Sequence, residues 1–163
     1  DDISKQHGFR LNVQVYTCLV QACILNRKLD QALELHDTMV SDSGCRVDEK
    51  FYAVLAKGCL QMHQPMKALQ VVRAAYQLPG HGLATPARRG RPVGVEGSAL
   101  AEVAAKLQAG GKEEQDALQA LREELSEQGV EISDARGRGG RGGKGGGGGG
   151  KGGGKGGVRG GGR

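Results

Sequence analysis

Residues 8–40 read GFRLNVQVYTCLVQACILNRKLDQALELHDTMV, and 36 residues further on, at 44–76, the chain reads GCRVDEKFYAVLAKGCLQMHQPMKALQVVRAAY. The two segments share seven identical positions, where ordinary residue frequencies predict about two. A period of this size is typical of repeat proteins, in which one unit buries its apolar face only against the next unit. The identical pairs are Gly8/Gly44, Arg10/Arg46, Tyr16/Tyr52, Leu19/Leu55, Cys23/Cys59, Ala32/Ala68 and Leu33/Leu69.

Each unit carries the apolar pattern of two helices separated by a short turn. The first stripe in the first unit has helical spacing and predicts a packed face; it consists of Val15, Leu19, Ala22 and Cys23. A turn at residues 26–28 precedes the second stripe, formed by Leu29, Ala32, Leu33 and Val40. In the second unit Pro65 falls in the first turn of a helix, and Gly8 and Gly44 fall where a helix C-cap favours glycine. We therefore predict an all-α fold, a short α-solenoid of helix-turn-helix units.

Residues 13–48 resemble one pentatricopeptide repeat. The family pattern has Tyr-Asn-x-Leu-Ile, then Leu-x-x-Ala-x-x-Leu, Met, Gly and a final Asp. The matching residues here are Tyr16-Thr17-Cys18-Leu19-Val20, Leu29-Asp30-Gln31-Ala32-Leu33-Glu34-Leu35, Met39, Gly44 and Asp48. Residues 1–12 resemble the end of a preceding repeat, and residues 49–76 resemble a degenerate following repeat. The resemblance does not extend beyond residue 76.

The resemblance implies single-stranded RNA binding along the first helices, with one base read per repeat. The fifth and last residues of a repeat contact the base, so Thr17 and Asp48 are the implied contacts, with guanine as the preferred base. Asn12 would be the last residue of the preceding repeat, whose fifth residue lies outside the chain. The second residues, Gln14 and Lys50, would pack against the base or the backbone. The resemblance also implies organellar transcripts, hence a mitochondrial or plastid location.

This sequence departs from the family at several of these positions. An aliphatic residue is usual where Gln14 and Lys50 stand, and Ala53, the fifth residue of the second unit, has no group that could read a base. The inner-face lysine common in the family is replaced by Leu25 and Gln61. The alternative is a tetratricopeptide-like scaffold that binds proteins and no nucleic acid. Its period is shorter, and its Trp-containing signature is absent because the chain has no Trp.

The net charge of +5 is concentrated in residues 136–163, a Gly-rich tail with eight basic and no acidic residues. The rest of the chain therefore carries a net charge of −3. The tail resembles the Arg-Gly-Gly segments of RNA-binding proteins, although it lacks aromatic residues for stacking. We expect it to be disordered and to bind RNA without sequence preference, the alternative being an incidental or solubilising tail. The contacting residues would be Arg136, Arg138, Arg141, Lys144, Lys151, Lys155, Arg159 and Arg163.

Two segments separate the repeats from the tail. Residues 77–97 are rich in Gly and Pro and are expected to be a linker, in which Arg89-Gly90-Arg91-Pro92 is only a weak match to a DNA-binding AT-hook. Residues 98–135 predict an acidic extension of two helices, a candidate surface for protein partners. The first helix would begin at the N-cap Ser98, and Gly110-Gly111 would separate it from the second, which would end near Gly129. The apolar positions are Leu100, Val103, Leu107, Leu118, Leu121 and Leu125; the acidic residues Glu113, Glu114, Asp116, Glu123 and Glu124 are expected in solvent or, alternatively, against the tail.

Other classes of function are not expected from the sequence. The four Cys are not at metal-ligand spacing, so we expect free thiols, no metal and no cofactor. His36 falls near the apolar stripe of its helix and is expected to be a half-buried packing residue, and no nucleophile-and-base arrangement predicts an enzyme. No apolar run is long enough to cross a membrane. Because the chain opens on Asp1, we expect a fragment or a processed product whose targeting segment lies outside it.

Overall fold

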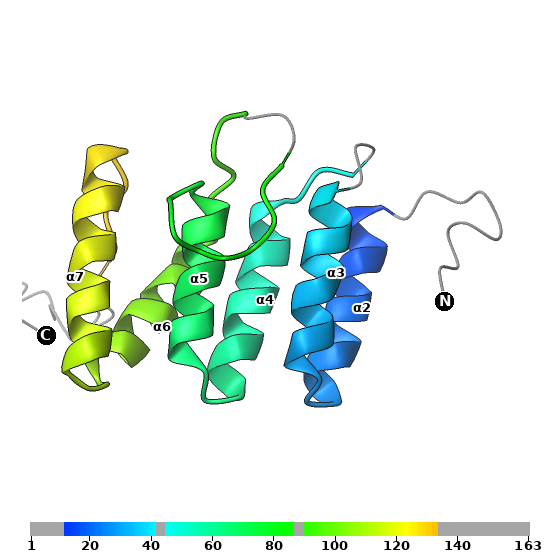
Figure 1. Cartoon of the computed structure of the whole chain (residues 1–163), viewed down its shortest axis with the longest axis horizontal. Coiled ribbons are helices and arrows are strands. Elements are labelled where there is room, and N and C mark those ends of the chain that lie inside the picture. Colours follow the sequence, from blue (N-terminus) through cyan, green and yellow to red (C-terminus); the bar gives the residue numbers. More distant parts are fainter. Residues whose placement is uncertain (1–11, 42–44, 87–89, 134–163) are drawn as a thin grey trace, which may run out of the picture.

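The computed structural model describes residues 12–41, 45–86 and 90–133, and every regular element within them is an α-helix (Figure 1). The helices are α2 (Val13–Leu25), α3 (Leu29–Ser41), α4 (Glu49–Gln61), α5 (Pro65–Ala75), α6 (Gly97–Gln108) and α7 (Lys112–Glu127). This confirms the all-α class for the described residues. The predicted caps at Gly8 and Gly44, Arg89 of the AT-hook match, and the tail at 136–163 lie outside them.

The helices form three hairpins: hairpin 1 (α2 and α3), hairpin 2 (α4 and α5) and hairpin 3 (α6 and α7). Hairpins 1 and 2 repeat at the interval found in the sequence, because α4 begins 36 residues after α2 and α5 begins 36 residues after α3. The tight turns inside the two hairpins also match, since Arg27 and His63 both have a φ of 57°. In each turn the next amide donates to a carbonyl five residues back, from Lys28 to Cys23 and from Gln64 to Cys59. Hairpins 1 and 2 are thus structural repeats.

Each hairpin packs against the next. Helix α4 contacts both helices of hairpin 1, and α6 contacts both helices of hairpin 2. The first helices form one continuous row because α2 contacts α4 and α4 contacts α6, and α7 contacts α5 on the other side. In Figure 1 the hairpins follow one another from α2 to α7 across the molecule. The molecule therefore has two ends, one at hairpin 1 and one at hairpin 3.

The apolar core is continuous through all three hairpins and is densest along α4. Phe51 and Leu55 of α4 are fully buried, and the Phe51 ring stacks on His36 of α3 with ring centroids 6.2 Å apart. Helix α4 comes so close to α2 that a Cβ at Gly58 would collide with the side chain of Ile24. The contact between hairpins 1 and 2 thus depends on a glycine inside a helix, a position where glycine otherwise disfavours the helix by about 1 kcal/mol relative to alanine.

The apolar stripe predicted for α2 is wrong as a packed face. Val15 and Leu19 are each 40% exposed and Ala22 is exposed, whereas the buried residues of α2 are Tyr16 and Val20. The reason is position: the described residues place no helix against this side of α2. The side of α2 that packs on α4 is its other flank.

Hairpin 3 buries the side chains that the sequence predicted: Leu100, Val103, Leu107, Leu118, Leu121 and Leu125. The predicted break at Gly110-Gly111 and the stop near Gly129, which has a φ of 77°, are confirmed. Ser98 is not the N-cap: α6 begins at Gly97 after Glu96, which makes no capping side-chain bond. Helix α6 therefore starts two residues earlier and without the expected cap.

The described parts of the segment that joins α5 to α6, residues 76–86 and 90–96, pack back over the helices. Leu78, His81 and Val95 within it are buried. The Ala84 N–H donates to Asp37 Oδ1 on α3 at 2.9 Å, and Arg73 of α5 donates to the Pro79 carbonyl at 3.0 Å. In Figure 1 this green segment crosses in front of α5 and α4. It connects hairpin 1 to the chain that follows hairpin 2.

Candidate nucleic-acid interface

Thr17 lies on α2 as its fifth residue and is half-buried. Its hydroxyl donates to the Val13 carbonyl one turn earlier, with an oxygen-to-oxygen distance of 2.7 Å. This bond uses the only hydrogen of the hydroxyl and leaves lone pairs on Oγ1. Thr17 can therefore offer a ligand an acceptor without breaking its bond to the helix.

Asp48 is the N-cap of α4. Its Oδ1 accepts from the Phe51 N–H at 2.7 Å, and the side chain is half-buried. A carboxylate has about four lone-pair positions, so this single bond leaves acceptor capacity. Because α2 and α4 pack together and run in the same direction, Thr17 and Asp48 both lie near the N-terminal ends of neighbouring helices (Figure 1).

Asn12 has the role in hairpin 1 that Asp48 has in hairpin 2. It is the N-cap of α2, and its Oδ1 accepts from the Val15 N–H at 3.0 Å. The side chain is exposed, and its amide nitrogen retains two donor hydrogens. The sequence assigned Asn12 and Asp48 only to base contact; the structure adds a capping role worth about 1 kcal/mol.

The other predicted contacts divide by exposure. Gln14 and Lys50 are the second residues of α2 and α4, and both are exposed at the same end as the caps. Ala53, the counterpart of Thr17 in the second unit, is only 3% exposed. A side chain buried to that degree cannot contact a ligand. Of the base-contact positions in the second unit, only Asp48 and Lys50 at the start of α4 are therefore open to a ligand.

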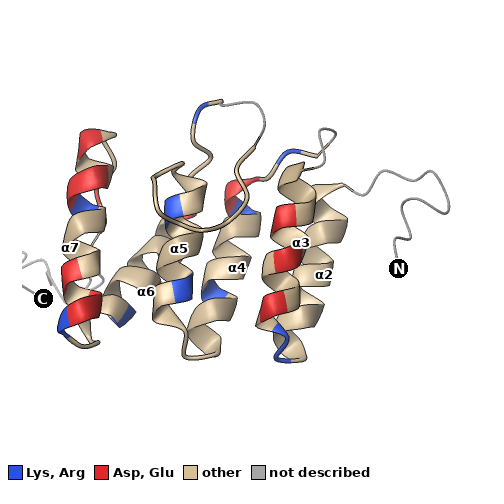
Figure 2. Ribbon diagram, in the orientation of Figure 1, with Lys and Arg blue, Asp and Glu red and all other residues tan. Residues whose placement is uncertain are grey.

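Charge does not gather over the first helices in the way that a phosphate-binding surface requires. In Figure 2 acidic residues, coloured red, recur along α3 and α7, and several basic side chains form ion pairs with acids. The Lys57 ammonium lies 3.8 Å from the Glu102 carboxylate, and Lys67 lies 3.1 Å from Asp30. Arg73 pairs with Glu124 at 2.8 Å, so Glu124 is not the freely solvated acid that the sequence predicted. The described helices therefore supply little net positive charge for a polyanion.

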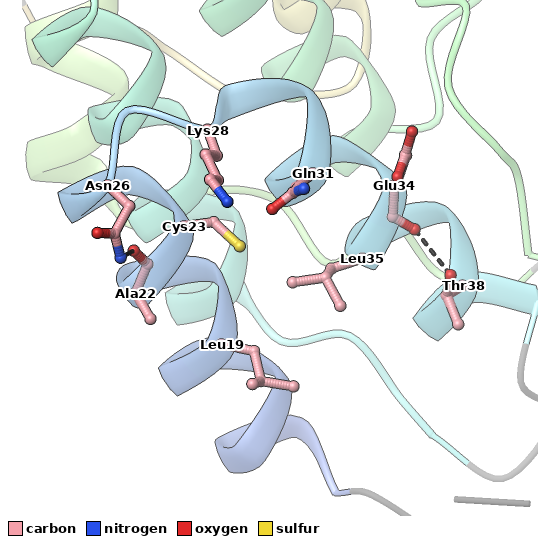
Figure 3. Close-up of a pocket in the computed structure, with 9 residues that line it drawn as sticks. All are labelled: Leu19, Ala22, Cys23, Asn26, Lys28, Gln31, Glu34, Leu35 and Thr38. Carbon is pink, nitrogen blue, oxygen red and sulfur yellow. Dashed lines mark hydrogen bonds between the residues drawn. The ribbon is translucent and has the colours of Figure 1, made fainter. Parts of the chain in front are cut away.

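A groove that the sequence did not predict opens between α2 and α3 on the outer side of hairpin 1 (Figure 3). Apolar atoms of Leu19, Ala22, Cys23 and Leu35 form part of it, and the sequence had assigned three of these to a packed stripe. The apolar spacing was the right signal, but it could not indicate that this stripe stays open. The polar lining residues are Asn26, Lys28, Gln31, Glu34 and Thr38.

His36 is fully buried between α3 and α4, deeper than the half-buried position expected. Its Nδ1 lies 2.9 Å from Asp37 Oδ1, and its Nε2 lies 3.3 Å from the Tyr52 hydroxyl. Burial lowers the pKa of His36 below its ordinary value of 6.5, although the hydrogen bond to Asp37 acts in the opposite direction. Burial also raises the pKa of Tyr52 to about 12. Both rings are therefore neutral near pH 7 and act as packed, hydrogen-bonded core residues.

The cysteines are free thiols. Cys59 is buried, and burial raises its pKa to about 12, whereas Cys18 is exposed on α2. Within the described residues, no three acidic, His or Cys side chains are arranged to hold a metal ion. Among the helices of those residues, none has the length and apolar character needed to cross a membrane.

Comparison of the chain with models of known protein families finds no match. Comparison with curated proteins likewise finds no match.

Proposed function

We propose that this chain binds single-stranded RNA through a short α-solenoid of pentatricopeptide-like repeats, helped by the basic tail. The observation that carries the proposal is the 36-residue interval, which relates both the sequences and the helices of hairpins 1 and 2. Matching N-caps at Asn12 and Asp48 and matching turns at Arg27 and His63 support it further. The implied RNAs are organellar transcripts in the mitochondrion or plastid, for which the resemblance is the support.

The chemistry around Thr17 and Asp48 favours guanine as the base. The Thr17 hydrogen is committed to Val13, and the Asp48 carboxylate can only accept, so both residues present acceptors. Guanine carries N–H donors on its Watson–Crick edge, whereas uracil presents carbonyl acceptors beside its single N–H. A pair of acceptors therefore matches guanine best. One such contact gives about 1–3 kcal/mol of discrimination.

Most of the affinity comes from the tail in this proposal. Residues 136–163 carry eight basic residues, and the described helices pair several of their own basic side chains with acids. Neutralising phosphates releases counterions, which gives binding that weakens steeply as salt rises. The repeats supply the choice of base, and the tail supplies attraction that is the same for every sequence.

Binding to homopolymeric single-stranded RNAs at two salt concentrations tests the proposal, with and without residues 136–163. We expect the complete chain to bind with a salt slope of up to about −0.7 per neutralised phosphate, and the shortened chain to bind more weakly with a smaller slope. If neither chain binds any RNA, the proposal is wrong. If only the complete chain binds, the repeats have no part in recognition.

A single substitution tests the base preference. Thr17→Asn adds an amide that both donates and accepts, and we expect it to move the preference from guanine toward uracil. Thr38→Asn is the matched control, because the Thr38 hydroxyl donates to the Glu34 carbonyl of its own helix in the same way but lies on α3. An unchanged base preference in the Thr17 variant would reject the assigned contact.

A protein-binding scaffold without a nucleic acid ligand is the second candidate. It is favoured by the apolar groove on hairpin 1 and by the acidic residues that recur along α3 and α7 (Figure 2), neither of which suits RNA. Failure of both chains to bind RNA in the experiment above would leave this candidate in its place.

A further inference from the structure

The outer side of hairpin 1 has the composition of a buried interface. Val15 and Leu19 are 40% exposed, but their counterparts 36 residues on, Phe51 and Leu55, are fully buried. The Phe51 ring stacks on His36 of hairpin 1 with ring centroids 6.2 Å apart, and Leu55 lies one turn further along the same face of α4, between Phe51 and Gly58. Ala22 corresponds in the same way to Gly58, which lies against Ile24. The same positions are therefore used for packing in one repeat and left open in the other.

The second helix of hairpin 1 continues this open face. Leu35 is half-buried in the groove, and its counterpart Val71 is fully buried. Gln31 also lines the groove, and its counterpart Lys67 reaches back across the hairpin boundary to Asp30 at 3.1 Å. The polar position of the boundary between hairpins 1 and 2, residue 67, thus has its counterpart at Gln31 on the open face.

The sequence before α2 indicates what belongs on this face. Residues 8–12, GFRLN, match residues 44–48, GCRVD, at the two identical positions Gly8/Gly44 and Arg10/Arg46. Residues 45–48 lead from α3 into α4, where Asp48 caps the helix as Asn12 caps α2. The segment before α2 therefore resembles the segment between α3 and α4, which follows the second helix of hairpin 1.

We propose that the open face of hairpin 1, formed by Val15, Leu19, Ala22, Cys23 and Leu35, is an interface for another helical hairpin that packs as hairpin 1 packs on hairpin 2. This proposal concerns packing and does not depend on RNA binding. Such an occupant continues an interface that the molecule already contains. A second copy of the chain presenting its other end fits less well, because most of the exposed residues of α7 are charged or amides, such as Glu113, Asp116 and Glu123, and none of them is a large apolar residue.

The occupant must differ from hairpin 1 at one position. Ile24 fits against α4 only because residue 58 is glycine, and the counterpart of that glycine on the open face is Ala22. The extra methyl group leaves no room for isoleucine at the matching point. The occupant therefore presents a side chain no larger than alanine there.

Insertion of a second copy of residues 13–48 between Asn12 and Val13 of the full chain tests the proposal. The inserted copy carries Ile24→Ala, and Cys18→Ser, Cys23→Ser and Cys45→Ser remove its own thiols. We expect the maleimide labelling of the original Cys23, which lines the groove, to slow at least tenfold. Labelling of the original Cys18, which is exposed outside the groove, should change less than twofold.

Two further versions of the inserted copy make the result specific. Ile24→Glu in place of Ile24→Ala should restore the labelling of Cys23, because it puts a carboxylate into the apolar contact. Leu25→Glu added to the Ile24→Ala copy should not restore it, since Leu25 is 84% exposed on α2. Circular dichroism reports whether the inserted unit adds helix.

Three outcomes would overturn the proposal. The first is unchanged labelling of Cys23 with the helical signal increased, which would mean that the unit folds but does not dock. The second is no increase in helical signal, since the face then fails to order a matching hairpin. The third is slow labelling of Cys23 already in the original chain at high protein concentration, with a doubled mass by light scattering, which would assign the face to a second copy.

Discussion

At the hairpin 3 end, α7 buries Leu118, Leu121 and Leu125 and exposes mostly charged residues and amides. At the hairpin 1 end, α2 leaves Val15 and Leu19 each 40% exposed. Both helices have apolar spacing, and both lie at an end of the molecule. The difference is that α7 has one apolar stripe and packs it on α5 and α6, whereas α2 has apolar residues on two sides and packs only one. A polar outer face is what closes a stack of repeats in solution. Hairpin 3 thus has the polar outer face of an end unit, whereas hairpin 1 has the partly apolar outer face that an inner unit would have.

Matched truncations at the two ends should give the largest effect. Leu121→Ala removes a fully buried side chain from α7, and we expect it to lower the free energy of unfolding by about 2–5 kcal/mol. Leu19→Ala removes a side chain that is already partly in water, so its cost should stay below about 1 kcal/mol. Urea unfolding followed by circular dichroism measures both. Equal costs would mean that Leu19 is covered in solution.

Gly58→Ala tests the close contact that the open face lacks. The added methyl group collides with Ile24, and overpacking of this kind costs about 1–3 kcal/mol in spite of the better helix propensity of alanine. The double variant Gly58→Ala with Ile24→Ala should recover the part of the lost unfolding free energy that is due to the collision. A Gly58→Ala variant as stable as the original chain would show that the helices separate easily at this boundary.

Acid should lower the free energy of unfolding of the whole molecule through the buried His36 of hairpin 1. The pKa of His36 is lowered by burial, so below pH 6.5 the unfolded chain binds a proton that the folded chain excludes, and stability falls as the pH falls. The slope for one such group approaches about 1.4 kcal/mol per pH unit. His81 adds to it in the same direction, because burial lowers its pKa as well.

Urea unfolding at pH 7, 6 and 5 measures this slope. His36→Val introduces the residue found at the equivalent position 72. It should reduce the pH dependence of the unfolding free energy, and the dependence that remains should be due to His81. His63→Gln, at an exposed position, is the control. A slope that survives both His36→Val and His81→Asn would refute the assignment.

The helix ends provide the smallest contrast. Gly129 follows α7 with a φ of 77°, whereas Arg27 holds the equivalent left-handed conformation in hairpin 1 without being glycine. Gly129→Ala should destabilise the protein by about 1 kcal/mol, because alanine is strained at this positive φ. Arg27→Gly should stabilise it by less than that. Glycine relieves the backbone strain at residue 27, but it also raises the conformational entropy of the unfolded chain, which offsets most of the gain. Thermal unfolding of both variants checks the signs.

The sequence correctly predicted the features that follow from the spacing of residues along the chain. It failed for features that depend on which elements pack against a residue. The interval of 36 residues placed the first helices at 13 and 49, and the leucines of α7 were assigned to the core correctly. A stripe shows that a face is apolar but not whether another element covers it, which is why Val15 and Leu19 were misassigned. The same limit applies to His36, whose burial depends on Tyr52, sixteen residues away.

The sequence predicted where Thr17 and Asp48 lie along the repeat, but it did not predict the hydrogen bonds that they form. The resemblance assigned Thr17 and Asp48 to base contact, which stays a prediction, and no pattern indicated that Val13 takes the threonine hydrogen or that Asp48 caps α4. The Ser98 cap failed because a serine before an apolar run fits either side of a helix start. Local hydrogen bonds of this kind depend on backbone angles that spacing does not specify.

The bond from the Ala84 N–H to Asp37 has a consequence for how the protein comes apart. In a row of repeats whose units touch only their neighbours, the end units can melt independently while the rest stays folded. Here the chain that leaves hairpin 2 returns to hairpin 1 at Asp37, and Arg73 links the same segment to Glu124 of hairpin 3. Loosening either end therefore removes a partner from the other. We therefore expect the three hairpins to melt in one cooperative transition. Without the returning segment, we would expect the end hairpins to melt separately.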